Sequence, residues 1–188
     1  MSDPISPLSG ARFDGIAHIE EAGPAGMITL RGDLASKPVK SIAATVTGAK
    51  LPAQGQIVFG KTGAVAWMSP DELMLFCAYE AAPAGVELAT ASFGAAHGLA
   101  VDVSDARAKF RISGPAAREV MGKIFPIDFA PGQFEPGRFR RSRMGQIAAA
   151  VWMEADGSFG IICFRSVAEY AFALLNESAL PGSAVGIY

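Results

Sequence analysis

Cysteine and histidine are scarce in this sequence, and their scarcity excludes several classes of site. Among 188 residues there are two cysteines and two histidines. Cys77 and Cys163 form no CxxC pair, and each stands in an apolar run, which is typical of a buried, inert thiol. His18 and His97 lie far apart in the sequence. We therefore expect neither a disulfide framework nor a metal site.

Long apolar runs and a strong net charge are also absent. No stretch reaches the ~18 consecutive apolar residues that a membrane-spanning helix needs, and the first residues lack the basic and apolar regions of a targeting signal. Without a targeting signal or a span, we expect a cytoplasmic location. The formal net charge is only −2, so we expect no nucleic-acid or membrane partner. By contrast, 51% of the residues are hydrophobic, and such an apolar surplus favours a stable protein partner.

Alternating and helical apolar patterns follow one another along the chain and predict an α+β fold. We expect strands at about 27–32, 57–59, 65–67, 73–77, 100–103, 109–113, 138–143, 146–153 and 158–164, helices at about 36–47, 83–95, 114–123 and 166–177, and a Pro- and Gly-rich loop at 125–136.

Particular residues mark the predicted helix ends. Asp33 or Ser36 can cap the first helix, and Gly48 can end it. Gly98 is expected to end the second helix, and the S-x-x-E sequence at 166–169 predicts a capping box for the last.

The order β-α-β-β-β-α occurs twice, which indicates an internal duplication. The two tryptophans, Trp67 and Trp152, stand in similar contexts 85 positions apart, and the two cysteines end the next strands 86 positions apart. Because half of such a chain cannot cover its own sheet, we expect two pseudo-twofold-related halves that form one α+β unit.

These patterns predict a simple domain organisation. Residues 1–25 lack periodicity and are expected to form an irregular arm, either frayed or ordered against a partner. Residues 26–180 would form the duplicated domain, with halves of about 27–97 and 98–178. Residues 181–188 would be a tail.

One segment matches the nucleotide phosphate loop, GxxxxGK[ST], at residues 55–62. That loop must be flexible and must lead into a helix whose N-terminus faces the phosphate. Here Ile57, Val58 and Phe59 favour a strand, and the residues after Gly63 alternate as another strand does. We therefore expect a hairpin with 61–63 at its turn.

A strand rich in arginine is the main candidate for a binding surface. Alternation places Arg138 and Arg140 on one face of the strand and Arg141 and Arg143 on the other, and Arg165 is a weaker member of the same class. Three interpretations stay open: a solvated edge strand that is protected by its charge, a partner-binding patch, and a site for a small anion.

No arrangement of residues predicts catalysis. Asp102, on a predicted strand, could be catalytic, but no base or nucleophile is paired with it, and Ser104 and Asp105 are typical of a turn or a cap. The two histidines suggest no Ser-His-Asp triad. We therefore predict neither catalytic nor cofactor-binding residues in this chain.

Three segments together resemble the folate-binding fold of the glycine-cleavage aminomethyltransferases. They are GLAVDVS at 98–104, FRISGPAA at 110–117 and FPIDFAPG at 125–132. Within that superfamily the chain most resembles the sarcosine oxidase gamma subunit family, through ISGP at 112–115, the arginine-rich strand and CFRSVAEY at 163–170. This resemblance covers most of residues 27–178 and implies a fold similar to the aminomethyltransferase folate-binding domain.

The chain departs from the folate enzymes where their chemistry takes place. In that family an acidic residue follows the glycines of a central strand, whereas the corresponding stretch here, MGQIAA at 144–149, has no carboxylate. Isoleucine or alanine cannot act as a general acid or base. The resemblance therefore implies a retained fold without the folate chemistry.

The resemblance implies a non-catalytic subunit of heterotetrameric sarcosine oxidase. Its expected partners are the alpha, beta and delta subunits, and FAD, FMN, NAD, tetrahydrofolate and zinc are expected in those subunits. The alternatives are a self-standing folate-binding one-carbon enzyme or sensor, and an unrelated binding module.

Overall fold

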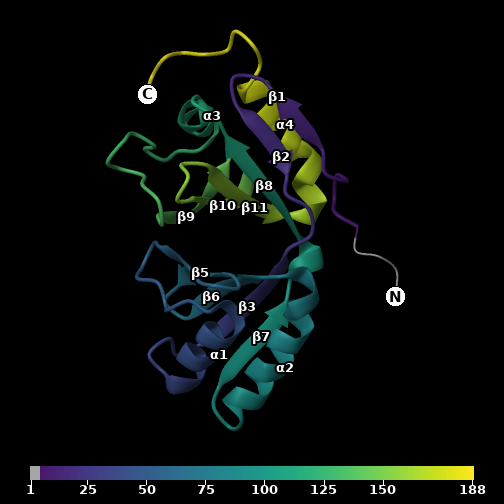
Figure 1. Cartoon of the computed structure of the whole chain (residues 1–188), viewed down its shortest axis with the longest axis vertical. Helices are drawn as coiled ribbons and strands as arrows, with labels where there is room; N and C mark the ends of the chain where they lie inside the picture. The colour runs from purple at the N-terminus through teal and green to yellow at the C-terminus, as the bar shows by residue number, and fades with distance from the viewer. Residues whose placement is uncertain (1–4) are drawn as a thin grey trace. The chain divides into compact units, whose positions relative to one another are not determined.

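The computed structural model describes residues 5–188, which fold as two compact units. Residues 25–105 form one, here called the inner unit, and the residues up to Pro24 with Ala106–Tyr188 form the other, the split unit. Their elements are labelled in Figure 1. No helix of the described residues is long and apolar enough to cross a membrane.

The inner unit is a five-stranded antiparallel sheet with two helices on one face. Its elements are β3 (Gly26–Gly32), α1 (Lys37–Thr47), β4 (Ile57–Phe59), β5 (Ala64–Ser69), β6 (Glu72–Cys77), α2 (Ala82–Phe93) and β7 (Gly98–Asp102). The strand order is β4-β5-β6-β3-β7. Ile28, Leu30 and Leu75 of the sheet share a core with Ile42 of α1 and Ala89 of α2.

Local signals account for α1. The Ser36 side chain accepts a hydrogen bond from the Val39 amide at 3.4 Å, and Pro38 lies in the first turn. Gly48 ends the helix at φ 68°, a left-handed conformation that glycine adopts at little cost. The predicted helix is thus confirmed, with Ser36 rather than Asp33 as its cap.

The split unit contains a six-stranded antiparallel sheet. Its elements are β1 (Arg12–Asp14), β2 (His18–Glu21), β8 (Arg107–Ser113), α3 (Ala117–Ile124), β9 (Phe139–Met144), β10 (Ile147–Met153), β11 (Phe159–Phe164) and α4 (Ala168–Ser178). The strand order is β1-β2-β8-β11-β10-β9. Its core joins Ile19, Phe110 and Ile161 of the sheet to Val120 of α3 and Leu175 of α4.

The predicted loop at 125–136 has no regular structure but is not loose. Phe129 and Phe134 are buried, with ring centroids 4.8 Å apart, and Phe129 also meets Phe159 edge-on. The Arg118 guanidinium donates to the backbone oxygens of Phe129 and Phe134, at 2.6 and 2.8 Å. The loop is therefore part of the core.

The two sheets repeat the same strand order, in agreement with the predicted duplication. β4-β5-β6-β3-β7 in the inner unit corresponds to β9-β10-β11-β8-β2 in the split unit. Trp67 and Trp152 lie in the equivalent strands β5 and β10, and Cys77 and Cys163 lie in β6 and β11. In each repeat the first strand, β2 or β7, pairs within the sheet of the other repeat.

This exchange of strands corrects two sequence expectations. Residues 5–25 do not form an irregular arm, because β2 pairs with β8 and Ile19 is fully buried; the first four residues of the predicted arm lie outside the described part. The compact units divide at Asp105 and not at residue 97, because β7 begins the second repeat but completes the inner sheet. The tail at 181–188 lacks helix and strand.

Two predicted helix ends are also wrong. α2 ends at Phe93, and Gly98 instead begins β7. A Cβ at Gly98 would lie 2.2 Å from the Phe93 ring, so this glycine provides room for close packing. The capping box at 166–169 does not form, because a 3₁₀ turn, η3 (Arg165–Val167), precedes α4, which has no side-chain cap.

Gly160 of β11 provides a test of the split-unit sheet. It lies directly opposite Trp152, and a Cβ at Gly160 would lie 2.2 Å from two atoms of the indole ring. We predict that Gly160→Ala lowers the free energy of unfolding by about 1–3 kcal/mol through overpacking. Urea denaturation measures the loss. In a Trp152→Leu background the same substitution should cost much less, and an equal cost in both backgrounds would disprove the contact.

Candidate partner-binding surface

The arginine-rich strand is β9, which lies at the edge of the split-unit sheet and pairs only with β10. Buried residues hold both of its ends: Phe139 stacks on the Trp152 ring at 6.3 Å, and Met144 is fully buried. Between them Arg140, Arg141 and Arg143 are exposed. The edge strand is thus fixed by its ends while its middle presents positive charge.

The register places the arginines on two faces, as the alternation predicted. Arg140 lies opposite Val151, a core residue on the helix-covered face. Arg141 and Arg143 lie opposite Ala150 and Ala148, on the other face. The guanidinium of Arg143 donates to the backbone oxygen at position 146 at 2.8 Å, which limits its freedom.

The five predicted arginines do not form one cluster. The backbone oxygen of Arg138 accepts a hydrogen bond from the Met153 amide, which places Arg138 at one end of the sheet. Arg143 pairs with Ala148 at the opposite end, where β11 ends and Arg165 follows. Arg165 donates to the backbone oxygen at position 5 at 2.8 Å. Only Arg143 and Arg165 therefore share an end of the sheet, with β10 between their strands.

At that same end lies a contact that the sequence did not reveal. The Arg107 guanidinium lies 4.1 Å from the centre of the Phe164 ring, directly across the β8–β11 pair. Phe164 is 49% exposed although it is a large aromatic residue. Arginine and exposed aromatic side chains are enriched in protein interfaces. We call Arg107, Arg143, Phe164 and Arg165 the basic end of the sheet.

The segment that matches the phosphate loop is a hairpin, as predicted. β4 and β5 pair antiparallel, and the Gly60 amide donates to the Gly63 oxygen at 2.8 Å. The Thr62 hydroxyl donates to the Val46 oxygen at 3.2 Å. No helix follows the turn, since Ala64 begins β5. The N-terminal helix end that would face a phosphate is therefore missing from this place.

Asp102 has a structural role. Its carboxylate accepts hydrogen bonds from the Ser104 amide and hydroxyl, and that hydroxyl accepts one from the Met27 amide at 2.9 Å. Asp105 accepts a hydrogen bond from the Tyr79 hydroxyl. These contacts fix the turn after β7, as the sequence suggested.

The stretch at 144–149 forms the turn between β9 and β10. Gly145 adopts φ 55° there, and its amide donates to the Ile124 oxygen. Ile147 is half-buried and Ala149 is buried. The turn offers no acidic side chain, and among residues 5–188 no group of three His, Cys, Asp or Glu side chains could hold a metal ion.

Comparison with known proteins identifies the family. The family model described as "Sarcosine oxidase, gamma subunit family" matches residues 31–180. The chain belongs to this family. A gamma subunit of sarcosine oxidase from Corynebacterium sp. (strain U-96) is 30% identical over 146 residues, which are 77% of this chain and 70% of that one.

Solved structures agree with this assignment. The structure matches a chain of the heterotetrameric sarcosine oxidase from Corynebacterium sp. U-96, which was solved in complex with pyrrole 2-carboxylate. The TM-score is 0.82, the sequence identity is 25%, and the match covers 97% of this chain and 98% of that chain. The glycine cleavage system aminomethyltransferase T from Bartonella henselae matches with a TM-score of 0.58 and 13% identity, covering 80% of this chain and 43% of that one. The second likeness concerns the fold alone.

The turn at 144–149 contains no carboxyl group in this chain. The fold resembles that of the aminomethyltransferase, and Gly145 here is followed by Gln146, Ile147 and two alanines. None of these side chains can donate or accept a proton as a carboxyl group does.

The cysteines of this family member are free thiols with suppressed reactivity. Burial raises the pKa of the Cys163 thiol to about 11, although the nearby positive charge of Arg107 partly opposes the shift. Burial, and then the negative charge of Asp102, raises the pKa of Cys77. Because only the thiolate is a good nucleophile, both thiols are expected to react slowly.

We predict that iodoacetamide at pH 8 leaves Cys163 unmodified in the native protein and labels it only after unfolding. The raised pKa of Cys163 keeps its thiol almost fully protonated at pH 8. Peptide mass spectrometry locates the label, and Cys163→Ala serves as the control, which removes one site from the unfolded protein alone. Rapid native labelling of Cys163 would contradict its burial.

Proposed function

We propose that this chain is the gamma subunit of a heterotetrameric sarcosine oxidase and that it supports the assembly without catalysing a reaction. The observation that carries the proposal is the match to a chain of such a complex over nearly the whole length of both, at a TM-score of 0.82. The match covers 97% of this chain and 98% of that chain.

The complex would oxidatively demethylate sarcosine to glycine, with peroxide and formaldehyde or methylene-tetrahydrofolate as the other products. In this proposal FAD, FMN, NAD, tetrahydrofolate and zinc belong to the alpha, beta and delta subunits. The turn after β9 supports this division, because it presents Gln146 and Ile147 where the folate enzymes present a carboxylate.

The arginines of β9 and the basic end would bind a partner subunit. Arg141 and Arg143 lie on the face of the edge strand opposite the helices, and Phe164 adds an exposed aromatic ring beside Arg107. Guanidinium groups form paired hydrogen bonds with carboxylates, so the proposed partner surface is acidic. Arg138, Arg140 and Arg165 are expected to contribute at its margins.

A self-standing folate-binding enzyme or sensor is the second candidate. The observation that favours it is the likeness of fold to the aminomethyltransferase, at a TM-score of 0.58. Fold alone does not determine activity, and the turn at 144–149 lacks the acidic residue that this chemistry requires.

Reversal of charge tests the arginine surface. We predict that Arg141→Glu/Arg143→Glu, co-expressed with the alpha, beta and delta subunits of the same host, lowers the amount of gamma chain in the purified complex at least tenfold. The matched control, Lys50→Glu/Lys61→Glu, also reverses two charges but in the inner unit, and should leave the complex intact. Equal recovery of both variants would refute the role of β9.

Titration with tetrahydrofolate separates the two functions. For the isolated chain we expect no saturable binding in the micromolar range by calorimetry, and no turnover of a methylated glycine. The aminomethyltransferase provides a positive control for the assay. Micromolar binding together with turnover by the isolated chain would establish the second candidate instead.

A further inference from the structure

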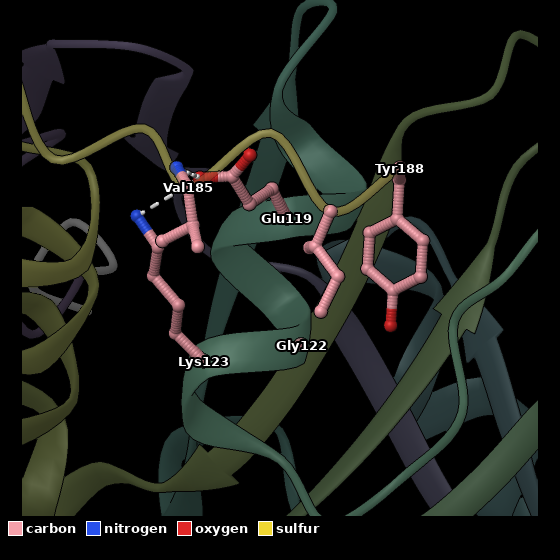
Figure 2. A pocket seen from close by; sticks show the side chains of 6 residues that line it. Glu119, Gly122, Lys123, Val185 and Tyr188 are labelled. Atoms are coloured by element: carbon pink, nitrogen blue, oxygen red, sulfur yellow. Dashed lines mark hydrogen bonds and ion pairs between the residues drawn. The ribbon is translucent and has the colours of Figure 1, made fainter.

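The segment after α4, residues 180–188, runs back along α3 and is held there by a buried carboxylate (Figure 2). Glu119 is 6% exposed, and its two oxygens accept hydrogen bonds from the Val185 amide at 2.5 Å and the Gly186 amide at 2.9 Å. A carboxylate that accepts two backbone hydrogen bonds fixes the course of the chain at that point. We call residues 180–188 the arm.

Two further contacts fix the arm to α3. The Lys123 ammonium donates to the Ser183 oxygen at 2.7 Å and forms an ion pair with Glu119 at 3.3 Å. The Tyr188 ring lies against Gly122, where an added Cβ would be 3.1 Å from the ring. The arm is therefore attached at Ser183, at Val185–Gly186 and at Tyr188.

The anchors at Ser183 and Val185–Gly186 bind the backbone of the arm, and the apolar side chains of the arm remain largely in water. Val185 is 71% exposed, Ile187 is 64% exposed and Tyr188 is 46% exposed. Together with Leu180, the arm supplies four of the eleven large exposed hydrophobic residues among residues 5–188. Apolar side chains that are concentrated on an ordered segment are typical of a protein-binding site.

A cavity lies between the arm and α3, and Figure 2 shows the side chains that line it. Its volume is about 100 Å³, and Glu119, Gly122, Lys123, Val185, Ile187 and Tyr188 line it. A single water needs only ~10–15 Å³ on the same scale, so the cavity has room for an aliphatic side chain. Glu119 and Lys123 neutralise each other, which disfavours an isolated ion as the occupant.

We propose that the arm and α3 together form a docking site for a larger subunit of the complex, which inserts an aliphatic side chain into the cavity. The proposal rests on the proposed function, because it assumes that such subunits exist. The anchored backbone favours binding, since the arm loses little conformational freedom when the partner arrives. Val185, Ile187 and Tyr188 would be covered in the assembled complex.

The titration of Glu119 is consistent with an arm that stays attached at neutral pH. The Val185 amide, with smaller contributions from the Gly186 amide and Lys123, lowers the pKa of Glu119 despite its partial desolvation. Because the pKa of Glu119 is lower in the folded state than in the unfolded state, its ionised carboxylate stabilises the fold at any pH above the unfolded pKa. This stabilisation is lost as the pH falls through the lower pKa of the folded state. The arm should therefore detach in acid and not near pH 7.

Co-expression of full-length variants with the three other subunits tests the docking site. Ile187→Ser/Tyr188→Ser removes the apolar contacts, and Gly122→Leu fills the cavity from α3. Leucine is a better helix former than glycine, so α3 should stay folded in Gly122→Leu, while the new side chain also displaces the Tyr188 ring that lies against Gly122. Leu88→Ser, on the exposed side of α2, is the matched control for loss of an apolar surface residue.

We expect both arm variants to reduce the gamma chain in the purified complex at least tenfold, while wild type and Leu88→Ser are recovered equally. Normal recovery of Gly122→Leu and of the double variant would overturn the docking site and leave the proposed function intact. If the wild-type chain did not co-purify with the other three subunits, both the proposed function and the docking site would be refuted. A dimer of the isolated chain that both arm variants abolish would assign the arm to self-association instead.

Discussion

The exchange of β2 and β7 is the constraint on which the rest of the structure depends. Each repeat contributes four strands to one sheet and two helices that pack on it. The sheet of the first repeat also contains β7 of the second repeat, and the sheet of the second repeat also contains β2 of the first. Ile19 of β2 is fully buried in the core of the split unit, so the core is incomplete without a segment nearly 90 residues before β8. Pairing at such separations makes folding slow and cooperative, because the chain must close long loops first.

Local sequence signals predicted the elements that depend on neighbouring residues. Ser36 and Gly48 mark α1 because a helix cap is decided within four positions, and the strands of 57–77 and 138–164 follow from alternation. β1 and β2 were missed because β2 is stabilised by pairing with β8 and β1 by pairing with β2, and because buried Glu21 interrupts the apolar pattern. Gly98 was wrongly predicted to end a helix, because the reason for a glycine there is the close approach of the Phe93 ring, which depends on how β7 packs against α2.

The same limit applies to the candidate site. Period-two alternation correctly separated Arg140 from Arg141 and Arg143, since that arrangement is a property of any strand. Arg107 and Phe164, which stack on each other, are 57 positions apart, and Glu119 and Val185, which are joined by a hydrogen bond, are 66 positions apart. A single sequence contains no signal that such distant residues are in contact.

The charge on β9 has a consequence for the subunit before any partner arrives. An edge strand exposes unpaired backbone N–H and C=O groups to which a strand of a second molecule could add. Two copies of β9 placed side by side would bring their exposed arginines at 140, 141 and 143 together, and like charges oppose that pairing. The positive charge of β9 therefore opposes edge-to-edge association of two copies through this strand, in addition to any role in recognising an acidic surface.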